Sequence, residues 1–120
     1  MKVKKIWRTI EKQQGEAAET YFNDMLTAAK AKGKLPPWIV GWERHEKWSC
    51  ADINGIDFTI KTDRGEVYFD IKSSTLGVKR FQNKNPNSKS IPIAVNILVR
   101  PETFLGKFIS ILGSTYRTMK

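Results

Sequence analysis

The sequence predicts a single α/β domain in which a central mixed β-sheet is flanked by helices. A helix-forming segment occupies about residues 7–32, two alternating runs surround a turn at 56–72, and an apolar helical segment follows Pro101. The chain has 120 residues, which is the length of one domain, so 1–120 is expected to form a single unit. A hydrophobic fraction of 40% is enough to fill one core.

The first helix is expected from about Trp7 to Lys32, where Glu, Gln, Ala and Lys are frequent and proline is absent. A step of 100° per residue gathers a set of apolar residues on the face that enters the core: Ala18, Phe22, Met25 and Ala29. Glu19 falls on the border of this face, whereas Glu16 falls nearly opposite its centre, in solvent. Gly33 and Pro36-Pro37 end the helix.

A first strand, or a strand and a loop, is expected between Trp38 and Trp48. Its tryptophans are Trp38, Trp42 and Trp48, which could fill the core or stack on bases. We expect at least two of them to lie in the core, because large aromatic side chains are usually buried.

The next segment has the pattern of a β-hairpin, with alternating runs on either side of the turn Asp63-Arg64-Gly65. Alternation places one set of residues, all apolar, on one face of the strands: Ile56, Phe58, Ile60, Val67, Phe69 and Ile71. It places a more polar set on the other face: Asp57, Thr59, Lys61, Tyr68, Asp70 and Lys72. If both apolar rows face the same core, then Asp57, Asp70 and Lys72 emerge together on the opposite face.

The remaining chain is predicted to contain a loop, a strand and a helix. Residues Thr75 to Ser90 are rich in Asn, Ser, Lys and Gly, which favours a mobile basic loop with at most one helical turn. Ile91 to Val99 is almost continuously apolar, as expected of a buried strand. Pro101 suits the first position of a helix, and an apolar stripe continues to about Tyr116.

Composition restricts the classes of function. There are 21 Lys and Arg against 12 Asp and Glu, and the net charge of +9 indicates a polyanionic partner. No apolar run is long enough to span a membrane and no apolar signal segment follows the N-terminus, so we expect a soluble, intracellular protein of the cytoplasm. The single cysteine, Cys50, is interpreted as a packing residue.

Two carboxylates and a lysine on one face of a hairpin must each be solvated, paired or bound to a metal. Carboxylate oxygens are ligands that Mg²⁺ prefers, and Mn²⁺ is an expected substitute. Asp57 and Asp70 would bind the ion, and Lys72 would orient a water or stabilise developing negative charge. The alternative interpretation is an exposed ion pair of Asp70 and Lys72. Asp52 is expected in a turn, and His45, the only histidine, is a weaker candidate for a general base.

Two short motifs resemble a known family. Gly55-Ile56-Asp57 and Asp70-Ile71-Lys72 resemble the paired motif of the PD-(D/E)xK, or restriction-endonuclease-like, nuclease superfamily. The resemblance implies that Asp57 and Asp70 bind metal and that Lys72 is catalytic. A further acidic ligand comes from the first helix in that superfamily, and residues 15–19 resemble the helix motif of archaeal Holliday-junction resolvases. Together with the helical-face argument, this favours Glu19 over Glu16.

The expected function is therefore Mg²⁺-dependent endonucleolytic cleavage of DNA, including branched or junction DNA. An RNA-cleaving enzyme or toxin on the same fold is one alternative, and an inactive nucleic-acid-binding module is another. A homodimer is plausible because cutting two strands calls for two active sites. Candidate phosphate-binding residues lie near the N-terminus and in the predicted loop: Lys4, Lys5, Arg8, Lys79, Arg80, Lys84 and Lys89.

Overall fold

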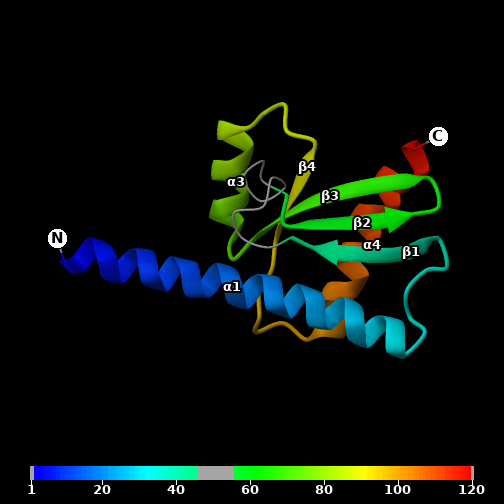
Figure 1. The fold of residues 1–120 in the computed structure, drawn as a ribbon, viewed down its shortest axis with the longest axis horizontal. Helices are drawn as coiled ribbons and strands as arrows, with labels where there is room; N and C mark the ends of the chain where they lie inside the picture. The colour runs from blue at the N-terminus through cyan, green and yellow to red at the C-terminus, as the bar shows by residue number, and fades with distance from the viewer. Residues whose placement is uncertain (1, 46–55, 120) are drawn as a thin grey trace.

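The fold is a four-stranded sheet with helices on both faces. The computed structural model describes the backbone of residues 2–45 and 56–119 and the side chains of residues 13–45 and 56–119. The elements follow in this order: α1 (Lys2–Ala31), β1 (Ile39–Arg44), β2 (Phe58–Thr62), β3 (Gly65–Lys72), α3 (Thr75–Lys84), β4 (Ser90–Ala94) and α4 (Pro101–Thr118). The N-terminal half of α1 extends beyond the sheet (Figure 1).

The sheet is mixed, as the sequence predicted. Its strands lie in the order β1-β2-β3-β4, with β2 antiparallel to β1 and to β3, while β3 and β4 are parallel. Two parallel neighbours need a crossover connection, and α3 supplies it between β3 and β4. The carboxyl ends of these two strands therefore meet at the same end of the sheet.

The core lies between one face of the sheet and the helices α1 and α4. Phe22 of α1 is fully buried, and its ring contacts those of Phe58 and Phe69 on the sheet and Phe108 on α4. The apolar positions predicted for the hairpin face this core, because Phe58, Ile60, Val67, Phe69 and Ile71 are all buried. The predicted assignment of hairpin faces is thus confirmed.

The predicted loop at residues 75–90 is wrong in part, because residues 75–84 form α3. The helix begins after Ser74, whose side-chain oxygen accepts a hydrogen bond from the backbone N–H of Gly77 at 3.1 Å. No residue of α3 is buried, because the helix contacts the sheet along only a narrow strip. Its composition is therefore mostly polar, and for this reason the sequence pattern did not predict a helix. Lys72 lies against this strip, with Nζ 5.1 Å from the centre of the Phe81 ring. The helix therefore covers the polar face of β3.

The strand predicted at Ile91–Val99 is shorter than expected. β4 ends at Ala94, and Ile97 and Leu98 are exposed. Asn96 turns the chain there, since its side-chain oxygen accepts a hydrogen bond from Leu98 N and its carbonyl oxygen accepts one from Val99 N.

Trp38 and Trp42 are both half-buried against the core, as predicted for two of the three tryptophans. Trp48 lies outside the described residues, as do Cys50 and Asp52, for which a packing role and a turn were predicted. None of the described helices has the length and apolar character needed to cross a membrane.

Candidate active site

The candidate site begins with a row of polar residues that crosses three neighbouring strands. Phe58 pairs with Phe69, and one step further Asp57 lies opposite Asp70, with Asp57 N donating to Phe69 O at 2.9 Å. On the other side, His45 N donates to Asp57 O at 2.9 Å. Side chains directly opposite each other in a sheet share a face, so His45, Asp57 and Asp70 occur side by side on its polar face.

Asp57 is fixed by the neighbouring strand. Its Oδ2 atom accepts a hydrogen bond from the backbone N–H of Ile71 at 2.7 Å. One carboxylate oxygen of this half-buried side chain is therefore engaged by β3. The bond holds the Asp57 carboxylate next to Ile71. This residue lies between Asp70 and Lys72, the two other members of the predicted site.

Asp70 and Lys72 form an ion pair in which the acid is buried and the base is not. Lys72 Nζ lies 3.1 Å from Asp70 Oδ2, and their side chains are 32% and 5% exposed respectively. Despite this distance, Asp70 Oδ2 has no partner in hydrogen-bonding geometry. A buried carboxylate oxygen without a hydrogen bond is costly, so this atom is a natural position for a further cationic ligand.

The neighbouring carboxyl group of Asp57 also disfavours the ionised form of Asp70. Burial raises the pKa of Asp70 most, and a hydrogen bond with Asp57 and the negative charge of Asp57 raise it as well. Against the opposing effect of Lys72, the pKa reaches about 7. Two carboxylates this close repel each other when both are ionised. A bound cation would remove that repulsion.

These residues fit a small divalent cation with few protein ligands. No group of three or more His, Cys, Asp or Glu side chains that could hold a metal occurs within residues 13–45 and 56–119. Mg²⁺ needs fewer, since it commonly takes one or two carboxylates and completes its shell with water and substrate phosphate. Asp57 and Asp70 supply such a pair, and Asp70 Oδ2 is the carboxylate oxygen that has no hydrogen-bond partner.

The helix carboxylates lie where the sequence placed them relative to the core. Glu19 is half-buried on α1 and Glu16 is exposed, which agrees with the helical-face argument. Glu19 does not join Asp57 and Asp70 in a three-ligand group within the described residues. Its role as a third ligand stays a prediction.

His45 contacts a threonine on the polar face. Its Nε2 atom lies 2.7 Å from Thr59 Oγ1, and Thr59 is only 5% exposed. The hydroxyl fixes the half-buried imidazole next to Asp57. This contact holds His45 beside the site. Its use as a general base stays a prediction.

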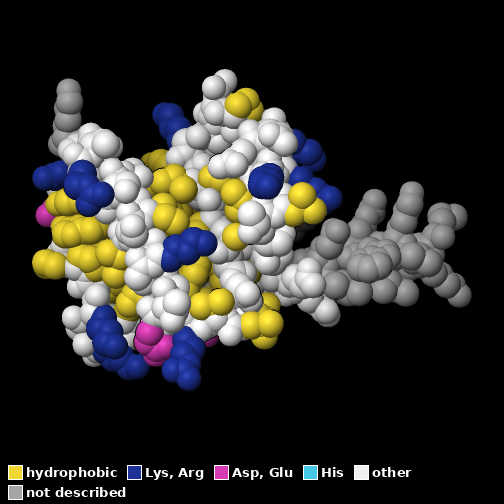
Figure 2. All heavy atoms as spheres, turned by 180° about the vertical axis from the view of Figure 1, so that it is seen from behind, with side chains coloured by type: hydrophobic (Ala, Val, Ile, Leu, Met, Phe, Trp, Pro, Cys, Tyr) yellow, Lys and Arg dark blue, Asp and Glu magenta, His cyan; other side chains and the backbone are white. Residues whose placement is uncertain are grey.

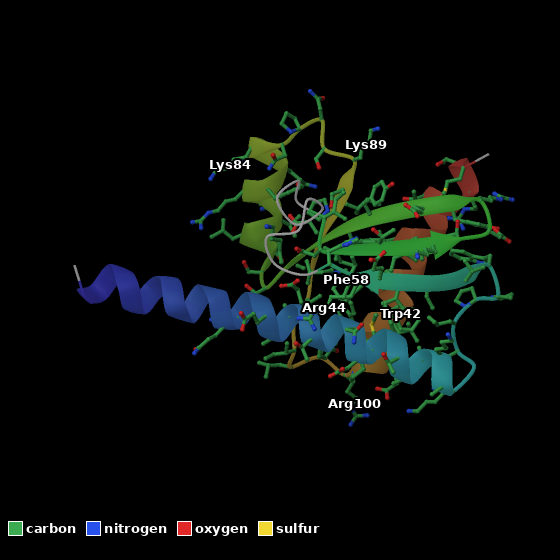
Figure 3. The ribbon with its side chains drawn as sticks, in the orientation of Figure 1. Trp42, Arg44, Phe58, Lys84, Lys89 and Arg100 are labelled. Carbon is green, nitrogen blue, oxygen red and sulfur yellow. The ribbon has the colours of Figure 1, made fainter. Side chains whose placement is uncertain are left out.

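Exposed basic side chains occur on several parts of the surface. On α3 and the segment after it, Lys79, Arg80, Lys84 and Lys89 are all exposed. Lys84 and Lys89 point outward at the far end of α3, whereas Arg100 lies across the molecule at the start of α4 (Figure 3). On the opposite view, Lys and Arg side chains are more widespread than acidic ones (Figure 2). Lys4, Lys5 and Arg8 lie on α1, and their side chains are outside the described residues.

A cleft beside Lys72 was not predicted from the sequence. It is lined in part by Ser73, Ser74, Ile97 and Leu98, of which the last two had been assigned to a buried strand. The signal that could have revealed it is Asn96, because an asparagine within an apolar run favours a turn.

Comparisons with known proteins return no match to a family model, to a curated protein or to a solved structure. Function is therefore inferred from the site itself.

Proposed function

We propose that this protein is a Mg²⁺-dependent endonuclease that hydrolyses phosphodiester bonds of DNA on a restriction-endonuclease-like fold. The observation that supports it best is the convergence of Asp57, Asp70 and Lys72 at the carboxyl end of β3, with Asp70 Oδ2 buried and without a hydrogen bond. An ordinary exposed ion pair explains neither the burial of Asp70 nor its raised pKa.

Asp57 and Asp70 would hold the ion, which supplies Lewis acidity that neutralises phosphate charge and makes a neighbouring water more acidic. Asp57 is oriented for this by the hydrogen bond that its Oδ2 accepts from Ile71 N. Lys72 keeps its ammonium group beside Asp70, where it can bind a phosphate oxygen and stabilise charge that develops on it. The contact with Phe81 limits the positions that this ammonium can take.

The surroundings of the site suit a polyanion. α3 begins three residues beyond Lys72 and has no acidic residue in its first turn, so the helix adds partial positive charge near the site. Lys79 and Arg80 on the same helix are exposed and could bind the backbone next to the cut. A mixed sheet flanked by helices is also compatible with the core of that superfamily.

The proposal is tested by incubating labelled duplex, branched and single-stranded DNA, and RNA, with Mg²⁺ or Mn²⁺. Wild type is compared with Asp70→Asn, with Lys72→Ala and with Lys61→Ala, a matched control because Lys61 is an exposed lysine on the same hairpin. We expect the control to cut DNA at the wild-type rate and the two site variants to lose at least about a hundredfold in rate.

Cleavage that persists in both site variants would overturn the assignment of the site. Cutting confined to RNA would favour the RNA-cleaving alternative, and binding without cutting under either metal would favour a non-enzymatic binding module. Because one domain holds one such site, we also expect a homodimer on duplex substrates, which a light-scattering mass of the complex would reveal.

A further inference from the structure

A cleft of about 550 Å³ opens next to the proposed active site. It lies between α1 and the segments that follow β3 and β4, at the shared carboxyl end of these parallel strands. Its wall is joined to the site through the backbone, since Ser73 follows Lys72 directly and Val95 N donates to Lys72 O at 2.8 Å. The wall of the cleft is therefore continuous with the backbone of Lys72.

The described residues that line the cleft give it two kinds of surface. Ala17 and Val95 contribute apolar surface, while Gln13, Gln14 and Asn96 contribute amide groups that can both donate and accept hydrogen bonds. None of the described residues that line the cleft is charged. A flat, uncharged group with apolar faces and polar edges is the better match, and a nucleobase has this chemistry.

The rim of the cleft displays apolar side chains that the fold does not cover. Leu98 is 90% exposed and Ile97 is 53% exposed. They are held in this position because Asn96 Oδ1 accepts a hydrogen bond from Leu98 N at 3.0 Å, while Tyr21 fixes the next carbonyl, that of Val99. Single exposed leucines are common. A pair of apolar side chains held in place at the edge of a cleft is instead typical of a surface that contacts a ligand or partner.

We propose that the cleft binds an unpaired nucleobase of the nucleic-acid substrate, close to the phosphate at Lys72, with Leu98 against the face of the base. This inference rests on the proposed function and specifies its substrate class. A base inside a duplex must be unpaired and unstacked before it can enter, which costs a few kcal/mol. Single strands, flaps and mismatched sites would therefore be preferred over perfect duplex.

Binding can be tested without cleavage, in EDTA, using DNA that contains 2-aminopurine at one position, either unpaired or paired. We expect the fluorescence of the unpaired probe to rise on binding, because the base leaves its stacked neighbours for a cleft whose described lining residues include no aromatic side chain. Ala17→Leu, which fills the cleft, should abolish the rise. Ala28→Leu is the matched control, because Ala28 is exposed on the same helix and does not line the cleft.

Cleavage provides the second test, in Mg²⁺. We expect wild type to cut substrates with an unpaired base at least about tenfold faster than perfect duplex, because each ~1.4 kcal/mol of the unstacking cost corresponds to a factor of about ten. Leu98→Ala should reduce this preference, whereas Leu76→Ala, which removes an exposed leucine from α3, should keep it. Both positions are at the surface, so neither variant should fail to fold.

The inference is overturned if wild type cuts paired and unpaired substrates equally and Ala17→Leu behaves as Ala28→Leu does. It is also overturned if Leu98→Asp changes the mass of the free protein but not its substrate preference, since the rim would then be a contact between copies of this chain. Failure to cut any nucleic acid would instead count against the proposed function, so the two failures are distinguishable.

Discussion

Asp70 is the residue whose chemistry depends most on its surroundings. It is buried on a face of the sheet that alternation marks as polar, and it lies next to a second acid and a lysine. Its raised pKa makes the site sensitive to pH without a metal. Two predictions at the residue scale use this property.

The first prediction concerns stability against pH in the absence of divalent ions. The pKa of Asp70 is raised from 3.8 to about 7 in the folded state, so the folded protein holds this proton more tightly than the unfolded chain does. Its contribution to stability is present below about pH 4 and is lost as pH rises to about 7, by on the order of 4 kcal/mol. Urea unfolding between pH 4.5 and 8 should show this loss in wild type and not in Asp70→Asn.

Asp24→Asn is the control for this experiment, because Asp24 is an exposed acid on α1. It should keep the wild-type loss of stability. Adding Mg²⁺ should restore part of the stability of wild type above pH 7, because ligand binding to the folded state stabilises it. A pH dependence that is identical in wild type and Asp70→Asn would contradict the prediction.

The second prediction concerns the interaction between the two acids. Asp57→Asn removes a negative charge while its amide oxygen can still accept the bond from Ile71 N. The pKa of Asp70 should therefore fall, because both the charge and the hydrogen bond of Asp57 raise it. A carboxyl carbon NMR titration measures this pKa, with Glu66→Gln, on the exposed part of β3, as the control. An unchanged Asp70 pKa in Asp57→Asn would show that the two acids are not coupled.

At the scale of elements, the stability of α3 depends more on the capping of its ends than on the burial of its faces. It has no buried residue, so its stability comes from local interactions such as the Ser74 cap and from its contacts with the sheet. The helix matters for the site because Lys72 lies against Phe81.

The third prediction is that Ser74→Ala destabilises α3 by about 1 kcal/mol, because the N–H of Gly77 loses its acceptor. Hydrogen exchange should become faster for the amides of α3 while those of β2 change little. Ser74→Asn keeps a capping oxygen and should exchange as wild type does. Equal exchange in all three proteins would show that the cap is unimportant.

At the scale of the whole molecule, an excess of positive charge is distributed around a sheet with one acidic site. The net charge is +9, and α3, which follows β3 in the chain, carries exposed bases. A surface of this kind binds a polyanion by releasing counterions, so affinity should depend steeply on salt.

The fourth prediction compares two doubly substituted proteins of equal charge. Lys79→Ala with Arg80→Ala removes bases of α3, whereas Lys32→Ala with Lys107→Ala removes exposed bases from the end of α1 and from α4. A fluorescence-anisotropy titration of duplex DNA over a range of salt gives the slope of log affinity against log salt. We expect the α3 pair to reduce the slope by about 2 and the other pair to leave it unchanged. Equal slopes would mean that DNA does not contact α3.

Local pattern was sufficient to predict much of the fold and part of the site. Alternation assigned the faces of the hairpin, and helical periodicity placed Phe22 inside and Glu16 outside. Both depend on the fixed repeat of one element, which can be read from consecutive residues. Asp57, Asp70 and Lys72 were brought to one face by the same argument.

The sequence by itself determined the order of most elements, the faces of the hairpin and the three residues that meet at its polar side. Only the tertiary structure decided that residues 75–84 form a helix, that β4 ends at Ala94, and that a cleft opens beside Lys72. It also decided that Asp70 is buried with an unsatisfied oxygen. The reason is that burial, pKa and concave surface arise from contacts between segments distant along the chain, which no local repeat encodes.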